Sequence, residues 1–149
     1  MAVEIDQSGK LEQLDTNTVV AFSNKKAGVV YLKAGTKRKI VQYLRTTLIL
    51  RKDVYPILFA MVIFLLVESL DKNSTLIIDE EYTGKNEVIK ETLEKLLVKR
   101  HGKKWQGIIR FDQIGKHSPA HTLAWKTHRQ KIKTRIVKIT EKAVLKLLE

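Results

Sequence analysis

The spacing of hydrophobic and polar residues predicts short strands followed by alternating helices and strands. Period-two alternation or short apolar runs predict strands over 2–6, 18–23, 29–33, 74–79 and 105–111. The first strand could continue through 10–14, and the segment 130–139 fits either a strand or an extended linker. Apolar residues three and four apart predict helices over 37–47, 54–70, 85–100, 119–129 and 141–149. This order of elements is typical of an α/β protein.

Turn and capping residues mark the boundaries between these elements. The link 24–28 contains Asn and Gly and predicts a hairpin, so the first three strands should form an antiparallel meander. Ser118 and Pro119 are typical of the N-cap and first position of a helix. Further N-caps are expected at Asp53, Thr83 and Thr140. On the helix 37–47, one side is expected to face inward: Ile40, Val41 and Leu44.

Length and composition limit the class of protein. With 149 residues, 44% of them hydrophobic, the chain has the size of one domain with a buried core. The longest apolar run, 54–67, is shorter than the about 20 residues that a membrane-spanning helix needs, so no membrane partner is expected. The absence of Cys excludes disulfides and thiolate sites. Because Glu4 and Asp6 also make the N-terminus unlike a secretory signal, we expect a cytoplasmic protein.

The positive charge of the chain is confined to its C-terminal third. Residues 1–94 contain 13 Lys and Arg and 13 Asp and Glu, whereas residues 95–149 contain 15 basic and 3 acidic residues. The formal net charge of +12 therefore belongs to the second segment. Such a block favours nucleic acid as the partner, because phosphate contacts need clustered Lys and Arg. A Lys-rich surface that only keeps the protein in solution is the alternative.

Acidic residues stand at or just after the ends of two predicted strands. Asp6 lies in VEIDQSGKL, and Asp79 closes the apolar run LIID. Glu81 follows two residues later and is a candidate third ligand, because it would share the face of Asp79 if the strand continued that far. Read separately, these acids also fit turns and a solvated loop. Carboxylates that converge from neighbouring strands are what a two-metal site for phosphodiester hydrolysis needs.

Histidine residues near the fourth predicted helix are further candidates. His121, in the first turn of that helix, could ligate a metal or transfer a proton, or be an ordinary helix residue. The four His residues of the chain suggest a zinc site, but their spacing is accompanied by no H-E-x-x-H pattern and no acid at a suitable distance; they are His101, His117, His121 and His128. A zinc site is therefore disfavoured.

The order of elements, together with IDQSG, LIIDEEYTG and KHSPAH, resembles the ribonuclease H-like superfamily of nucleases, resolvases and transposases. The resemblance covers residues 1–130 and implies a mixed central sheet, with an antiparallel three-strand meander followed by alternating helices and strands and with helices on both faces. It also implies that Asp6 and Asp79 lie side by side and hold Mg²⁺ or Mn²⁺, assisted by His121 from the last helix of the domain. Residues 131–149 would form a basic segment and an amphipathic helix packed on or next to the domain.

Two positions depart from the pattern of this superfamily. Gln7 stands where many relatives with an Asp-x-Ser-Gly motif have a second acid, and His121 stands where resolvases and transposases usually have Asp or Glu. The carboxylate set is therefore smaller than the resemblance would require for a full site.

These observations favour a metal-dependent nuclease or a related phosphoryl-transfer enzyme that acts on DNA or RNA. A nucleic-acid-binding module of the same fold without activity is the alternative, and a scaffold that binds an acidic protein ranks last. The amphipathic final helix also leaves a homodimer open. Residues expected to contact nucleic acid are Lys103, Lys104, Arg110, Lys116, Trp125, Arg129, Lys131 and Lys133.

Overall fold

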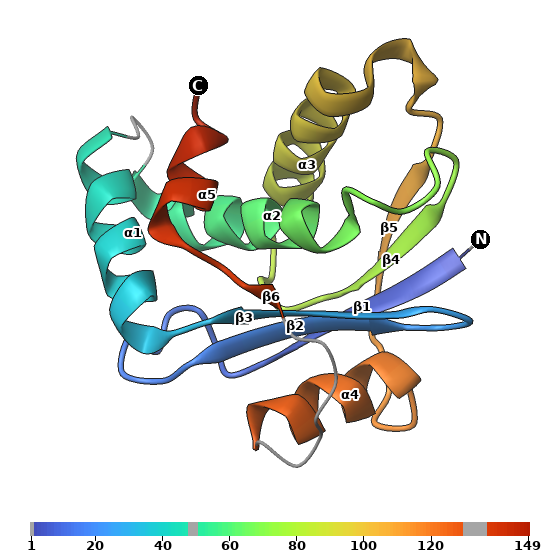
Figure 1. Ribbon diagram of the computed structural model, residues 1–149, viewed down its shortest axis with the longest axis horizontal. Coiled ribbons are helices and arrows are strands. Elements are labelled where there is room, and N and C mark those ends of the chain that lie inside the picture. Colours follow the sequence, from blue (N-terminus) through green and yellow to red (C-terminus); the bar gives the residue numbers. More distant parts are fainter. Residues whose placement is uncertain (1, 48–50, 130–136) are drawn as a thin grey trace.

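In the described part of the chain, six strands form one mixed sheet (Figure 1). The computed structural model describes residues 2–47, 51–129 and 137–149. The strands are β1 (Ala2–Ser8), β2 (Thr18–Ser23), β3 (Ala27–Leu32), β4 (Thr75–Asp79), β5 (Ile108–Asp112) and β6 (Val137–Lys138). They lie in the order β5-β4-β1-β2-β3-β6. The predicted α/β class is therefore confirmed.

The pairing of the strands divides the sheet at β1. The first three strands pair antiparallel, as the predicted hairpin and meander require. On the other side of β1, β4 runs parallel to it and β5 runs parallel to β4. β1 and β4 therefore end at the same edge of the sheet, and residues that follow either strand can meet there.

The two faces of the sheet carry different numbers of helices (Figure 1). One face is covered by α1 (Ala34–Thr47), α2 (Val54–Val67), α3 (Asn86–His101) and α5 (Glu141–Lys146), and the other by α4 (Pro119–His128). The main core lies on the first face and includes nearly every residue of α2, which explains why that helix is apolar on all sides. No helix within the described ranges combines the length and hydrophobicity needed to cross a membrane.

Two of the predicted N-caps are confirmed and two are wrong. Ser118 Oγ accepts the backbone N–H of Ala120 (3.3 Å), and Thr140 Oγ1 accepts that of Ala143 (3.1 Å). Asp53 stands at the N-cap position of α2 but makes no capping bond, because its buried carboxylate instead pairs with the ammonium of Lys85 at 2.8 Å. That lysine occupies the N-cap position of α3, where Thr83 does not act as the cap.

The loop between β1 and β2 is held by a buried lysine. The segment 10–14 forms turns rather than a continuation of β1. Lys37 of α1 has no exposed surface, and its Nζ donates to Gln13 O (2.7 Å), Thr18 Oγ1 (3.0 Å) and Lys10 O (3.2 Å). Burial lowers the pKa of Lys37 to about 8, although the three oxygen acceptors favour its ammonium form. The loop is thereby tied to α1.

The predictions for individual elements are confirmed in some details and differ from the structure in others. The predicted inward stripe of α1 is confirmed, since Ile40, Val41 and Leu44 are buried. β5 begins at Ile108 rather than at residue 105, and α2 ends at Val67. A strand or a linker was predicted for residues 130–139, of which 130–136 lie outside the described residues. β6, in the remaining part of that segment, pairs in parallel with β3. Within the final segment, two residues are buried in the main core: Ile139 and Val144.

Candidate metal-binding site

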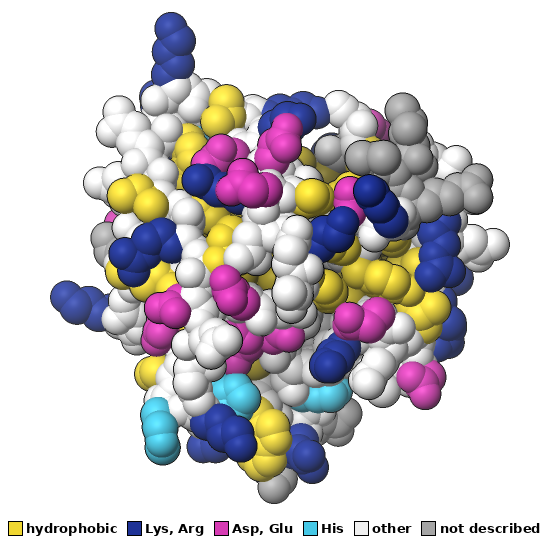
Figure 2. Space-filling model, turned by 180° about the vertical axis from the view of Figure 1, so that it is seen from behind, with side chains coloured by type: hydrophobic (Ala, Val, Ile, Leu, Met, Phe, Trp, Pro, Cys, Tyr) yellow, Lys and Arg dark blue, Asp and Glu magenta, His cyan; other side chains and the backbone are white. Residues whose placement is uncertain are grey.

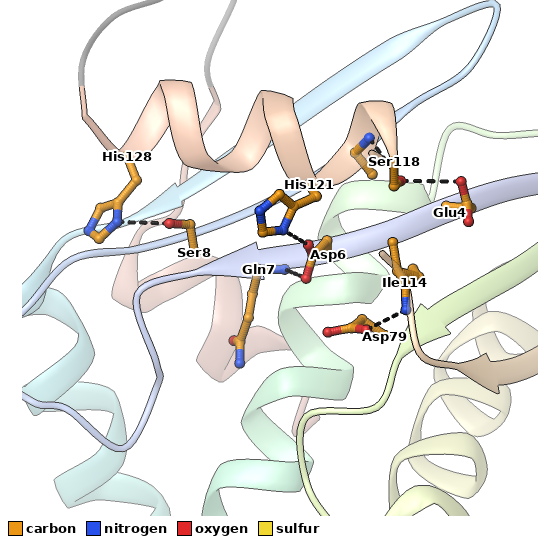
Figure 3. Close-up of polar contacts among 10 residues, drawn as sticks. Glu4, Asp6, Gln7, Ser8, Asp79, Ile114, Ser118, His121 and His128 are labelled. Carbon is orange, nitrogen blue, oxygen red and sulfur yellow. Dashed lines mark hydrogen bonds and ion pairs between the residues drawn. The ribbon is translucent and has the colours of Figure 1, made fainter. Parts of the chain in front are cut away.

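Alternation along β1 directs different side chains to the two faces of the sheet. Val3 and Ile5 enter the main core, whereas residues 4, 6 and 8 face α4. Each of these three polar residues is hydrogen-bonded to the segment of α4 (Figure 3). The pairs are Ser118 Oγ to Glu4 Oε1 (3.2 Å), His121 Nδ1 to Asp6 Oδ2 (2.7 Å), and Ser8 Oγ with His128 Nδ1 (2.9 Å).

Parallel pairing of β1 with β4 brings Asp6 next to Asp79. Ile5 pairs with Ile78, so the following residue on each strand lies at a neighbouring position on the same face. One carboxylate oxygen of Asp6, one of Asp79 and one of Glu81 all lie within 4.8 Å of one another. We call these three residues the carboxylate cluster. It lies where the carboxyl ends of β1 and β4 meet.

Glu81 reaches the cluster from the loop after β4, and several contacts hold this loop in place. The backbone N–H of Glu80 donates to Asp112 O (3.0 Å), which continues the contact between β4 and β5 by one residue. Tyr82 packs on Phe59, with ring centroids 5.4 Å apart. The ion pair of Lys85, described above, attaches the end of the loop to the start of α2. Glu81 is therefore placed by a braced loop and not by a longer strand.

Burial and mutual repulsion disfavour full ionisation of the carboxylate cluster. Asp6 is 2% exposed, and this burial raises its pKa; the hydrogen bond from His121 acts in the opposite direction, and the charge of Asp79 raises the pKa further. Burial, followed by its hydrogen bond with Asp79, raises the pKa of Glu81 to about 7. A divalent cation between the carboxylates would compensate their charges and favour the ionised forms.

Gln7 is a buried polar residue beside the cluster. Its backbone N–H donates to Asp6 Oδ1 at 2.8 Å, and its side chain is a hydrogen-bonding partner of Glu81. The side chain is 8% exposed, yet its oxygen, Oε1, has no hydrogen-bond partner. The hydroxyl of Tyr82 is buried without a partner as well. The sequence identified Gln7 only as a departure from a pattern.

The donor set of the cluster consists of oxygen atoms alone. Within the described ranges, Asp6, Asp79 and Glu81 are the single group of three His, Cys, Asp or Glu side chains with ligand atoms so close together. The histidines considered for zinc, residues 101, 117, 121 and 128, do not belong to such a group. Hard cations such as Mg²⁺ and Mn²⁺ prefer carboxylate oxygens, so the residues fit these metals better than zinc.

Two of the predicted nucleic-acid contacts lie on β5 and on the loop after it, whose Ile114 backbone N–H donates to Asp79 Oδ1 (2.8 Å). Asp112 pairs with Asp79, and Arg110, two residues earlier on β5, therefore shares the face of Asp79. Arg110 is exposed, and so is Lys116 in the loop that leads from β5 to α4. Figure 2 shows acidic side chains grouped on one face of the molecule beside His side chains, with Lys and Arg nearby.

The remaining predicted contacts are more widely separated. Trp125 of α4 is 40% exposed, and the guanidinium carbon of Arg129 lies 4.9 Å from its ring centroid. Lys103 and Lys104 precede β5 and so lie at the opposite edge of the sheet from the cluster, roughly 16 Å away along a five-residue strand. Lys131 and Lys133 lie outside the described residues.

Comparisons with other proteins add no relative from which function could be transferred. No protein-family model, no curated protein and no solved structure matches the chain. The assignment of function therefore depends on the geometry and chemistry of the carboxylate cluster and its neighbours.

Proposed function

We propose that the protein is a nuclease that depends on Mg²⁺ or Mn²⁺ and hydrolyses phosphodiester bonds in DNA or RNA. The observation that carries this proposal is the convergence of Asp6, Asp79 and Glu81, with ligand oxygens within 4.8 Å of one another. Bound metal would supply an activated water and charge stabilisation for the leaving oxygen. The three carboxylates would hold the metal, and the raised pKa values of Asp6 and Glu81 are consistent with a site that binds a cation.

His121 has a positioning role in this proposal and a second role in proton transfer. Its Nδ1 donates to Asp6 Oδ2, which holds the orientation of a carboxylate that is almost completely buried. The side chain of His121 is 36% exposed, so the ring reaches the surface. Because Nδ1 is engaged, Nε2 is the atom that would exchange a proton with substrate or water.

The topology and the charge distribution support the same proposal. The resemblance to ribonuclease H-like proteins requires β1 to lie beside β4, and these strands are parallel neighbours. The excess of 15 basic over 3 acidic residues after position 94 would compensate the phosphate charges of a bound strand. Arg110, Lys116 and Arg129 are the described cations for which we propose backbone contacts.

Cleavage assays with labelled oligonucleotides test the proposal. Single-stranded and duplex DNA and RNA would be incubated with the protein in Mg²⁺, Mn²⁺ or EDTA. We expect metal-dependent cleavage that Asp6→Asn and Asp79→Asn each reduce by about three orders of magnitude, since metal stabilisation of the transition state is worth several kcal/mol. Asp71→Asn makes the same chemical change at an exposed residue and should retain full activity.

Two results would count against the nuclease. Cleavage that survives Asp6→Asn would remove the proposed role of the cluster. Salt-sensitive binding of every substrate without metal-dependent cleavage would instead support the alternative, a nucleic-acid-binding module that uses phosphate contacts alone.

A further inference from the structure

The side-chain oxygen of Gln7 is a buried polar atom without a partner. Buried polar atoms in folded proteins are nearly always hydrogen-bonded, since leaving one unpaired costs about 1–3 kcal/mol. Gln7 is 8% exposed, and Oε1 has no hydrogen-bond donor within reach. The side-chain oxygen of Gln7 therefore lacks the partner that a buried oxygen normally has.

Both the backbone and the side chain of Gln7 contact the carboxylate cluster. The backbone N–H of Gln7 is bound to Asp6, and its side chain is a partner of Glu81. Figure 3 shows the side chain leaving β1 on the side away from α4 and reaching the level of Asp79. Since a carboxylate can only accept from the NH₂ group of the amide, the contact with Glu81 leaves the oxygen as the unpaired end.

We propose that Oε1 of Gln7 is a fourth ligand of the cation held by Asp6, Asp79 and Glu81. This inference rests on the proposed metal site. Amide oxygens are ordinary ligands of hard divalent cations, and coordination would provide the missing partner of Oε1. The site would then combine three carboxylates with one neutral oxygen, so that Gln7 occupies a ligand position instead of leaving a gap in an acidic set.

Tyr82 offers the competing explanation for the unpaired oxygen. Its hydroxyl is also buried with no partner at hydrogen-bonding geometry, and it lies beside the Gln7 side chain, whose interaction lowers the pKa of the hydroxyl. A rotation of the Gln7 amide could let the Tyr82 hydroxyl donate to Oε1 with no metal involved. In that case Tyr82→Phe would disturb the protein as much as a change at Gln7, whereas a metal ligand at Gln7 predicts that Tyr82→Phe leaves metal affinity unchanged.

Calorimetric titration with MnCl₂ separates these explanations. Gln7→Met keeps the length of the side chain but removes the oxygen, and we expect it to weaken Mn²⁺ binding by about tenfold or more. The melting temperature of metal-free Gln7→Met should stay close to that of the wild type, because removal of the unpaired oxygen offsets the loss of the hydrogen bond from the NH₂ group to Glu81. Tyr82→Phe should bind Mn²⁺ with the wild-type dissociation constant. Asp79→Asn reports on the metal site itself and should lose binding.

The outcomes distinguish failure of this inference from failure of the proposed function. If Asp79→Asn loses Mn²⁺ while Gln7→Met binds with the wild-type constant, the metal site stands and the role of Gln7 is overturned. If the wild type and Asp79→Asn do not differ, the metal site is overturned together with its fourth ligand. A crystal structure of the wild type with Mn²⁺ needs no variant: Oε1 should lie within about 2.0–2.6 Å of the ion. An ion coordinated by the carboxylates with Oε1 beyond this range would refute the inference.

Discussion

The two faces of the sheet are built differently, although β1 contributes to both. On the face of α1, α2, α3 and α5, β1 presents Val3 and Ile5 to a large apolar core. On the face of α4, the same strand presents Glu4, Asp6 and Ser8, and each is bound to a polar side chain of the α4 segment. The apolar cluster under α4 is much smaller: Val19, Ala21, Val29, Leu123 and Ala124.

Because of this difference, β1 contributes to the stability of the fold through one face and to the candidate site through the other. Burial of apolar area provides most of the stabilising free energy of a fold, so the four-helix face should determine whether the chain folds. The α4 face contains the buried carboxylate of Asp6 and the half-buried carboxylates of Glu4 and Asp79, which cost free energy unless they are paired or bound to a cation. Substitutions on the two faces should therefore have different effects.

The largest effect is expected for the same truncation made on each face. Leu58 in α2 is completely buried in the main core, and Leu123 in α4 is 8% exposed over the small cluster. Leu58→Ala should lower the free energy of unfolding by about 4 kcal/mol and Leu123→Ala by about 2 kcal/mol, within the range known for buried Leu→Ala changes. Urea unfolding with unchanged m-values measures both. An equal or greater loss at Leu123 would contradict the proposed division.

The next effect concerns the stabilisation of the protein by Mg²⁺ and its dependence on pH. Glu81 has a pKa of about 7 in the folded protein, against an ordinary value of 4.5, so the metal-free fold binds an additional proton between these values. The stability that this proton contributes is complete below pH 4.5 and is lost as the pH rises through 7. Because Mg²⁺ bound at the proposed site would displace this proton, its stabilising effect should be small at pH 5.5 and large at pH 8.

Thermal unfolding with and without Mg²⁺ at the two pH values checks this prediction. At a concentration one hundred times the dissociation constant, bound Mg²⁺ should add about 2.7 kcal/mol at pH 8. Asp79→Asn should show no gain at either pH. Equal stabilisation of the wild type at pH 5.5 and pH 8 would mean that Glu81 does not release a proton to the metal.

The smallest effect is expected at the third polar pair of the α4 face. Ser8→Ala removes the hydrogen bond with His128 and should reduce the free energy of unfolding by about 1 kcal/mol. Burial lowers the pKa of His128, so the pair should contribute in its neutral form at pH 7. Ser23→Ala, at the end of β2, is the matched control and should have almost no effect. A change in Mn²⁺ affinity for Ser8→Ala would extend the metal site beyond the carboxylate cluster.

Local sequence patterns were sufficient for most elements and for the identity of the two strand-end acids. They could not show that Asp6 and Asp79 are neighbours, because this depends on parallel pairing between strands far apart in the chain. The ligand role of Glu81 was predicted on the condition that the strand continued to it, with a solvated turn as the alternative. In the structure Glu81 lies in a loop, and contacts with distant residues hold that loop at the cluster. Asp53 likewise pairs with Lys85 and does not have the predicted capping role. No local sequence pattern predicts that ion pair.

The sequence contained a signal for the burial of Lys37, but a lysine at such a position is easily interpreted as solvent-exposed. Lys37 precedes Ile40, Val41 and Leu44 by three, four and seven residues, which places it on the inward stripe of α1. A lysine on such a stripe is usually assigned to the surface, because burial of an ammonium is costly. Only the three oxygen atoms supplied by the loop and β2 make this position favourable.

The pairing of His121 with Asp6 joins residues 115 positions apart in the chain. During synthesis, β1 leaves the ribosome long before α4 exists, and a domain generally folds as a unit. A nascent chain therefore passes through a period in which Asp6 has neither β4 nor His121 beside it. If the cluster cuts nucleic acid, this order of assembly delays its activity until nearly the whole chain has been made, which would protect the messenger and ribosomal RNA that surround it.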